Sequence, residues 1–153
     1  MNPISAARLG QYTLEIPIEA PRATVWQALS SEVDAWWPAD FRMVGEGSVL
    51  SFDAQAGGQL VERKEGGGSL LWYTVQMCTP GESIHLVGHV APEWGGPTTS
   101  MLKIALEEEE EGHTLVQLED SLFGHVTEET MQSLQEGWTL LLGSGLKTYA
   151  ESS

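Results

Sequence analysis

The sequence has a single cysteine, few basic residues and no long hydrophobic run. Cys78 alone excludes an intrachain disulfide, which is consistent with a reducing compartment. Seven Lys and Arg stand against 22 Asp and Glu, and the formal net charge of −15 disfavours nucleic acids and anionic membrane surfaces as partners. No apolar run approaches the ~20 residues that cross a bilayer, and residues 1–10 lack signal-peptide features. We therefore expect a cytoplasmic protein that neither inserts into membranes nor binds nucleic acid.

Common catalytic and metal-binding motifs are also missing. There is no Gly-x-Ser-x-Gly elbow, phosphate-binding glycine loop or dinucleotide fingerprint. His85 and His89 have a spacing that suits one metal ion on a helix, but their segment reads as a strand, where four residues span about 13 Å. Solvent-facing or singly hydrogen-bonded histidines are the other interpretation. We expect neither a metal nor another cofactor.

The composition is that of a packed globular protein, because 41% of the residues are hydrophobic and 19% are charged. A chain of 153 residues without repeats or linker-like segments predicts one domain over residues 1–153. Alternating apolar residues, separated by turns rich in Gly and Pro, predict strands at 12–18, 48–53, 58–64, 69–79, 82–91, 98–108 and 113–122. Five glutamates at 107–111 precede Gly112, and we interpret them as a solvated hairpin turn.

Helical patterns lie at both ends of this run of strands. Residues 21–31 and 32–37 predict two short helices, the second of which stops before Pro38. Thr127 is a candidate cap for a long final helix with one apolar stripe. The whole pattern predicts an α+β fold in which a curved antiparallel sheet packs on the last helix. Three glycines weaken that helix, so they need a tertiary reason such as close contact with the sheet or room for a ligand: Gly137, Gly143 and Gly145.

The order of these elements and several short phrases resemble a known family. The phrases are IPIEAP at 16–21, VW at 25–26, WWP at 36–38, GGQL at 57–60, LWYTV at 71–75 leading to Pro80, TLV at 114–116 and EGWTLL at 136–141. Together, over residues 10–150, they resemble the activator of heat-shock protein 90 ATPase homologue family of the START-like (SRPBCC) superfamily. The resemblance implies a helix-grip architecture with an internal cavity between the sheet and the last helix.

The resemblance implies less about activity, because one fold hosts many functions. The superfamily includes lipid carriers, polyketide cyclases and hydrolase-like members, and its co-chaperones join this kind of domain to a separate amino-terminal domain. Only the one domain is found in this sequence, which makes a co-chaperone role the lesser hypothesis. Tyr73 departs from the family, which often has a glycine after the tryptophan, and its ring would narrow the cavity.

Six tryptophans and the predicted inner faces of the strands define a candidate cavity. Aromatic walls with few polar groups suit a small apolar ligand, although the same rings could simply fill the core. The candidate ligand-binding residues are Trp36, Trp37 and Phe41 at the mouth, Tyr73, Val75, Met77, Leu86, Leu102, Ile104 and Asp120 on the sheet, and Met131, Trp138 and Leu141 on the helix.

Three further residues could carry chemistry. Asp120 follows the inward alternation of its strand, so it either faces the cavity as an acid, base or ligand anchor, or lies wet beyond the strand end. Glu62 is a similar but weaker candidate. Cys78 reads either as a nucleophile or as a small buried hydrophobe. No other catalytic residue is indicated.

We therefore expect a small, largely apolar molecule to bind in the cavity. The alternatives are a cyclase- or hydrolase-like enzyme using the same cavity, and a co-chaperone-like interaction domain for which no partner motif is found. The sequence leaves the ligand and the oligomeric state open.

Overall fold

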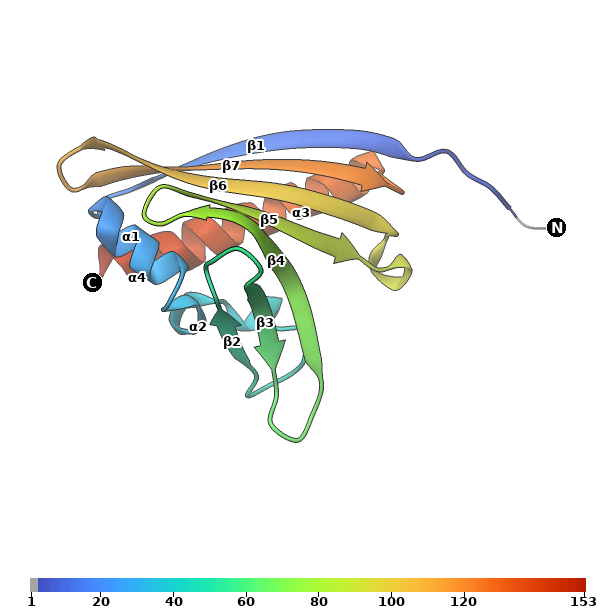
Figure 1. Cartoon of the computed structure of the whole chain (residues 1–153), viewed down its shortest axis with the longest axis horizontal. Helices are drawn as coiled ribbons and strands as arrows, with labels where there is room; N and C mark the ends of the chain where they lie inside the picture. The colour runs from blue at the N-terminus through green and yellow to red at the C-terminus, as the bar shows by residue number, and fades with distance from the viewer. Residues whose placement is uncertain (1–2) are drawn as a thin grey trace.

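The computed structural model describes residues 3–153 and shows a curved antiparallel sheet against a long C-terminal helix (Figure 1). Across the sheet the seven strands follow the order β1-β7-β6-β5-β4-β3-β2, so β2 to β7 form successive hairpins and β1 pairs beside β7. The predicted α+β helix-grip fold is confirmed. The strands are β1 (Arg8–Ile18), β2 (Val49–Phe52), β3 (Gln59–Arg63), β4 (Ser69–Thr79), β5 (Ser83–Val90), β6 (Thr98–Glu110) and β7 (His113–Gly124).

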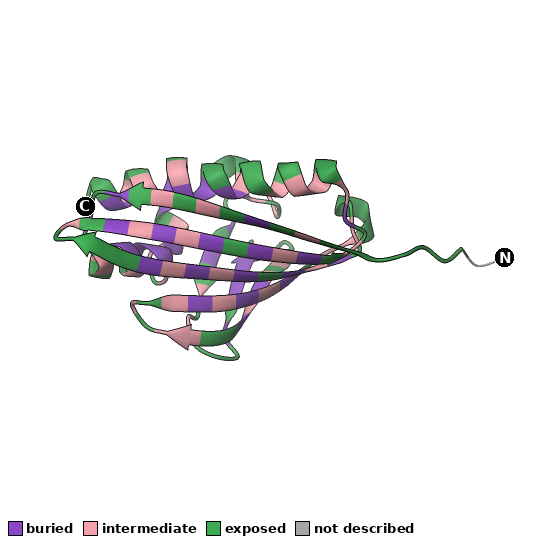
Figure 2. Ribbon diagram, turned by 90° about the horizontal axis from the view of Figure 1, so that it is seen from above, coloured by how far each residue is buried: buried purple, intermediate pink, exposed green. Residues whose placement is uncertain are grey.

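Side-chain alternation decides which face of the sheet is buried. Along β6 and β7, buried positions alternate with more exposed ones, as the bands in Figure 2 show. Leu102 and Ile104 on β6, and Leu118 and Leu122 on β7, are at most 2% exposed. Successive strand residues point to opposite faces, so these leucines and isoleucine share the face that packs on the helix.

The helices cover one face and one end of the sheet. After β1 come α1 (Arg22–Leu29), α2 (Val33–Trp36) and the 3-10 turn η1 (Ala39–Phe41); a second such turn, η2 (Pro92–Trp94), joins β5 to β6. The C-terminal helix runs through α3 (Glu128–Leu140), the π-helical η3 (Leu141–Lys147) and α4 (Thr148–Glu151). Thr127 caps it as predicted, since its side chain accepts a hydrogen bond from the Thr130 N–H. Within residues 3–153, no helix combines the length and apolar character needed to span a bilayer.

The π-helical turn lies against α2. A Cβ on Gly145 would come 2.9 Å from Cε3 of Trp36, closer than side chains normally pack. Leu142 and Leu146 in the same turn are fully buried. The glycine therefore permits a close approach between helices, whereas the sequence had suggested contact with the sheet or space for a ligand.

The start of β1 and the orientation of Met77 in β4 differ most from the prediction. β1 begins at Arg8 rather than residue 12, because it pairs with β7 as far as Gly124. In β4 a bulge shifts the register with β5 between Val75 and Met77. Met77 is consequently 56% exposed, while Cys78 packs against the core. The prediction that Met77 faces inward is wrong, because one extra residue reverses the alternation.

Candidate functional site

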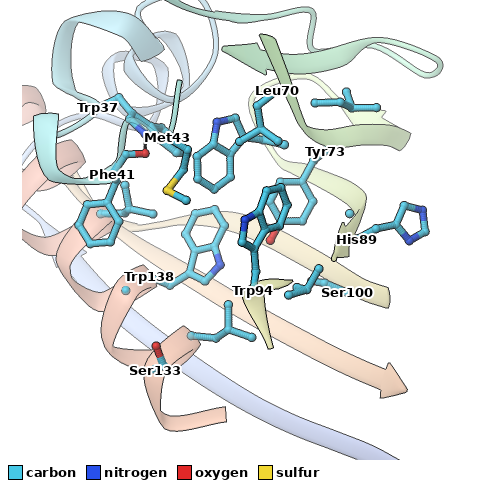
Figure 3. Close-up of a pocket in the computed structure, with 17 residues that line it drawn as sticks. Trp37, Phe41, Met43, Leu70, Tyr73, His89, Trp94, Ser100, Ser133 and Trp138 are labelled. Carbon is cyan, nitrogen blue, oxygen red and sulfur yellow. Dashed lines mark hydrogen bonds between the residues drawn. The ribbon is translucent and has the colours of Figure 1, made fainter. Parts of the chain in front are cut away.

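A cavity of about 330 Å³ lies between the sheet and α3 (Figure 3). The mouth segment, residues 37–48 between α2 and β2, lines the cavity together with β4, β5, η2, β6 and the C-terminal helix. The lining residues are Trp37, Phe41, Met43, Leu70, Leu71, Trp72, Tyr73, Gly88, His89, Val90, Trp94, Ser100, Ser133, Leu134, Gly137, Trp138 and Leu141.

Aromatic rings in mutual contact build much of the wall. The ring centroids of Trp37 and Trp72 are 5.3 Å apart, and those of Tyr73 and Trp138 are 6.0 Å apart, both in tilted arrangements. The Trp37 indole N–H donates to the carbonyl of Phe41 at 3.0 Å, which satisfies its polar atom while the ring stays apolar toward the cavity. The wall is thus largely apolar and built from rings in mutual contact.

Tyr73 and Gly88 form a complementary pair on neighbouring strands. A Cβ on Gly88 would come 2.8 Å from the Tyr73 ring and 2.7 Å from the carbonyl oxygen of Trp72. The Tyr73 ring therefore occupies the space over Gly88 that another side chain would need. This accounts for a large ring at a position where the sequence resemblance suggests a glycine: the small residue lies across the strand.

Glu62 on β3 holds the mouth segment in place. Its side chain is fully buried, and one carboxylate oxygen accepts from the Met43 N–H (3.0 Å) and the Trp72 indole N–H (3.1 Å). The other oxygen accepts from the Val44 N–H (2.8 Å) and the Ser48 hydroxyl (2.7 Å). Burial raises the pKa of Glu62, but these hydrogen bonds outweigh it and the net pKa lies below its ordinary value. Glu62 therefore stays an anion that anchors structure.

Arg42 ties the same segment to α2. Its guanidinium donates to the Asp34 carboxylate at 2.8 Å and to the backbone carbonyls of Trp37 and Ser48. Burial raises the pKa of Asp34, whereas the Leu50 N–H and Arg42 lower it by more, so the net pKa is lowered. The arginine is thereby committed to structure.

Asp120 lies on β7, one hydrogen bond behind the cavity wall. It is 1% exposed, and its two carboxylate oxygens accept from the hydroxyls of Tyr12 on β1 and Ser100 on β6, each at 2.7 Å. Burial raises the pKa of Asp120 above its ordinary value, and the two hydroxyls offset only part of that effect. Of these three residues, Ser100 lines the cavity.

A family profile described as activator of Hsp90 ATPase homolog 1-like protein matches residues 19–151. The chain belongs to this family. No curated protein has a significant sequence match to it.

Solved structures share the fold of this family member at low sequence identity. Protein MLL2253 from Mesorhizobium loti has 17% identity and a TM-score of 0.70, with 94% of this chain and 98% of that chain covered. The protein of unknown function EF2215 from Enterococcus faecalis has 15% identity and a TM-score of 0.69, with 94% and 72% covered. The anthrahydroquino-gamma-pyrone synthase Txn09 has 17% identity and a TM-score of 0.53, with 72% and 75% covered. These likenesses concern the fold.

In this family member, the cavity brings together five of the predicted ligand-binding residues: Trp37, Phe41, Tyr73, Trp138 and Leu141. The other predicted residues lie elsewhere. Val75, Leu86, Leu102 and Ile104 are buried in the core on the inner face of the sheet, and Asp120 lies behind Ser100.

Three aromatic or sulfur-containing residues have other neighbours than those predicted. Trp36 packs on Gly145 and donates its indole N–H to the Ala28 carbonyl at 2.6 Å. Met131 faces Gly10 of β1 along another groove of the helix. Met77 is turned outward by the bulge.

Several lining residues were not among those predicted, although some of them carry a usable signal in the sequence. Ser100 lies two residues before Leu102, so the alternation of β6 places it on the inner face. Leu134 precedes Trp138 by one helical turn. Trp94 has no periodic signal, because it lies in the turn η2 between strands β5 and β6. It lines the cavity because the fold brings this turn beside it.

The remaining candidates from the sequence are the Cys78 thiol, the glutamates at 107–111 and a metal-binding group. Burial raises the pKa of the Cys78 thiol, which disfavours the thiolate that a nucleophile requires. The glutamates at 107–111 are exposed as predicted, but residues 107–110 extend strand β6 and only Glu111 lies in the turn; Glu108 accepts from the Arg22 N–H at the start of α1. Within residues 3–153, no three His, Cys, Asp or Glu side chains are grouped to hold a metal ion.

Proposed function

We propose that this protein binds a small, largely apolar molecule in the cavity between the sheet and α3. The aromatic wall formed by Trp37, Trp72, Tyr73 and Trp138 carries the proposal, because it encloses about 330 Å³. Pockets for small molecules have volumes of about 300–1,000 Å³ and are lined mainly by apolar side chains with few polar groups. The cavity lies at the lower end of that range, which suits a ligand of one to three rings.

Glycine in the helix keeps part of this space open. A Cβ on Gly137 would lie 3.6 Å from Phe41, so a small addition would make ordinary contact and a larger one would enter the cavity. The glycine costs the helix about 1 kcal/mol relative to alanine. Room for a ligand is a tertiary reason for accepting that cost.

Native mass spectrometry of freshly purified protein tests the proposal directly. We expect a discrete extra mass that disappears on denaturation. The matched variants are Gly137→Leu, whose side chain enters the cavity, and Gly143→Leu, where an added Cβ would meet no neighbouring atom within 4 Å and the cavity stays unchanged. The extra mass should be lost in Gly137→Leu and kept in Gly143→Leu.

Tryptophan fluorescence supplies a second measurement that needs no copurified ligand. Titration with small aromatic probes should perturb the emission of Trp138 and its neighbours in the native protein and in Gly143→Leu, but not in Gly137→Leu. Equal responses from both variants would place binding outside the cavity and contradict the proposal.

A further inference from the structure

The inner end of the cavity is the part lined by Ser100 and Tyr73. We infer that this end selects a ligand that donates one hydrogen bond, such as a phenol-type hydroxyl on a flat apolar body, and rejects carboxylates. This inference rests on the proposed function and names its ligand class. It follows from the direction of the hydrogen bonds that converge on Asp120.

The buried carboxylate orients the hydroxyl protons around it. Ser100 donates to one oxygen of Asp120 and Tyr12 donates to the other, each at 2.7 Å. A serine hydroxyl has one proton and two lone pairs. Because the proton points away from the cavity toward Asp120, Ser100 offers only acceptor capacity to a ligand.

Tyr73 extends this polarity along the cavity wall. Its side chain stands beside Ser100 and Trp138, close enough to Asp120 for the carboxylate charge to act on it. Burial first, and then the Asp120 charge, raise the pKa of Tyr73, so the phenol stays protonated. The Trp138 indole N–H, which can only donate, forms a hydrogen bond to the Tyr73 hydroxyl and lowers its pKa, so the phenol oxygen acts as an acceptor at this end of the cavity.

No cationic side chain at the inner end offsets this charge. Among the described residues that line the cavity there is no lysine or arginine, and the nearby Arg42 is held by Asp34 and two carbonyls. His89 points away from the cavity in Figure 3, beside Thr99 at 3.2 Å. A carboxylate ligand would therefore meet lone pairs without a counter-ion and, at a pH where Asp120 is ionised, a buried negative charge as well, which is strongly unfavourable.

Four probes of similar shape separate the possibilities: naphthalene, 2-naphthol, 2-methoxynaphthalene and 2-naphthoate. Their dissociation constants are measured by calorimetry on the full chain. Naphthalene should bind, 2-naphthol should bind about five-fold tighter, and 2-naphthoate should bind at least ten-fold more weakly than naphthalene, because a neutral hydrogen bond adds about 1 kcal/mol. The methyl ether, which cannot donate, should lack the advantage of the naphthol.

Variants assign the advantage to the proposed acceptors. Ser100→Ala and Tyr73→Phe each remove a hydroxyl and should reduce the ratio between naphthalene and 2-naphthol toward one, while leaving naphthalene bound. The control is Ser121→Ala on the opposite face of β7, whose hydroxyl accepts from Gln11. It should keep the full ratio.

The outcomes distinguish the inference from the function on which it rests. If naphthalene binds but 2-naphthol binds no tighter, or 2-naphthoate binds best, the inference is overturned and the apolar cavity stands. A naphthol advantage that survives both Ser100→Ala and Tyr73→Phe overturns it as well. If none of the four probes binds, the proposed function fails and the inference falls with it.

Discussion

Replacing Glu62 by glutamine should destabilise the protein strongly, although the two side chains have nearly the same size and shape. The four groups that face the carboxylate are all donors: two backbone N–H groups, the Trp72 indole and the Ser48 hydroxyl. A glutamine side chain has one acceptor oxygen and one NH2 group. Whichever way it lies, the NH2 group opposes two donors.

The magnitude follows from the better of the two orientations. The Ser48 hydroxyl can rotate to accept, so the NH2 group should face that side and leave the Val44 N–H unpaired, at about 1–3 kcal/mol. The hydrogen bonds from Met43 and Trp72 then lose their charge assistance, at about 1 kcal/mol each. We expect a total loss of about 3–5 kcal/mol and a fall of roughly 10 °C in the unfolding midpoint of a domain this size.

Chemical denaturation at neutral pH measures this loss, with Glu65→Gln as the exposed control that should change stability by less than about 0.5 kcal/mol. A Glu62→Gln loss below about 1 kcal/mol would refute the reasoning, because it would mean that the four donors find partners without the carboxylate.

The pH dependence gives an independent check on Glu62. Its folded-state pKa is lowered, so its contribution to stability is present above the unfolded pKa and is lost as the pH falls through the folded pKa. The wild-type protein should therefore lose stability in acid more steeply than Glu62→Gln. Parallel acid curves for the two proteins would show that the carboxylate is not the group involved.

Other substitutions test the remaining contacts. Asp120→Asn should cost only about 1 kcal/mol, because its two side-chain partners are hydroxyls that can rotate and the amide oxygen can still accept from the Ser121 N–H. Since the pKa of Asp120 is raised, its favourable contribution is present below the unfolded pKa and is lost as the pH rises through the folded pKa; denaturation curves from pH 4 to 8 should show this decline in wild type and not in the variant. Gly145→Ala should destabilise by about 1–3 kcal/mol through its contact with Trp36, whereas Gly143→Ala should stabilise by up to about 1 kcal/mol; thermal melts with the same sign for both would contradict the packing argument. Gly88→Ala should lower stability by a similar ~1–3 kcal/mol, and an unchanged melting temperature would show that both the Tyr73 ring and the Trp72 carbonyl move without cost.

Much of the fold could be predicted because its signals are local. Strand alternation and glycine-containing turns predicted β4 without error at either end, and β2, β3 and β5 to within one residue at each. The Thr127 cap and the apolar stripe predicted the start of the last helix. The aromatic residues of the mouth were also visible as a cluster in the chain.

The inner wall was less predictable, because two of its features depend on neighbours distant in sequence. No residue near Met77 predicts the bulge that turns it outward, because the bulge depends on how β4 pairs with β5. Nothing near Tyr73 shows that its ring finds space over a glycine fifteen residues later, on the adjacent strand.

The sequence by itself determined the α+β class, the family, the acidic surface and the positions of most strands, since each depends on composition or on short-range periodicity. Only the tertiary structure decided what the buried carboxylates do. The sheet order β1-β7-β6 brings Tyr12, Asp120 and Ser100 into one hydrogen-bonded group, and the return of the mouth segment over β3 gives Glu62 its four donors. Glu62 and Asp120 have similar sequence patterns, since each is a carboxylate within a strand. Whether such a carboxylate anchors a loop or polarises a cavity depends on which distant donors the fold brings to it.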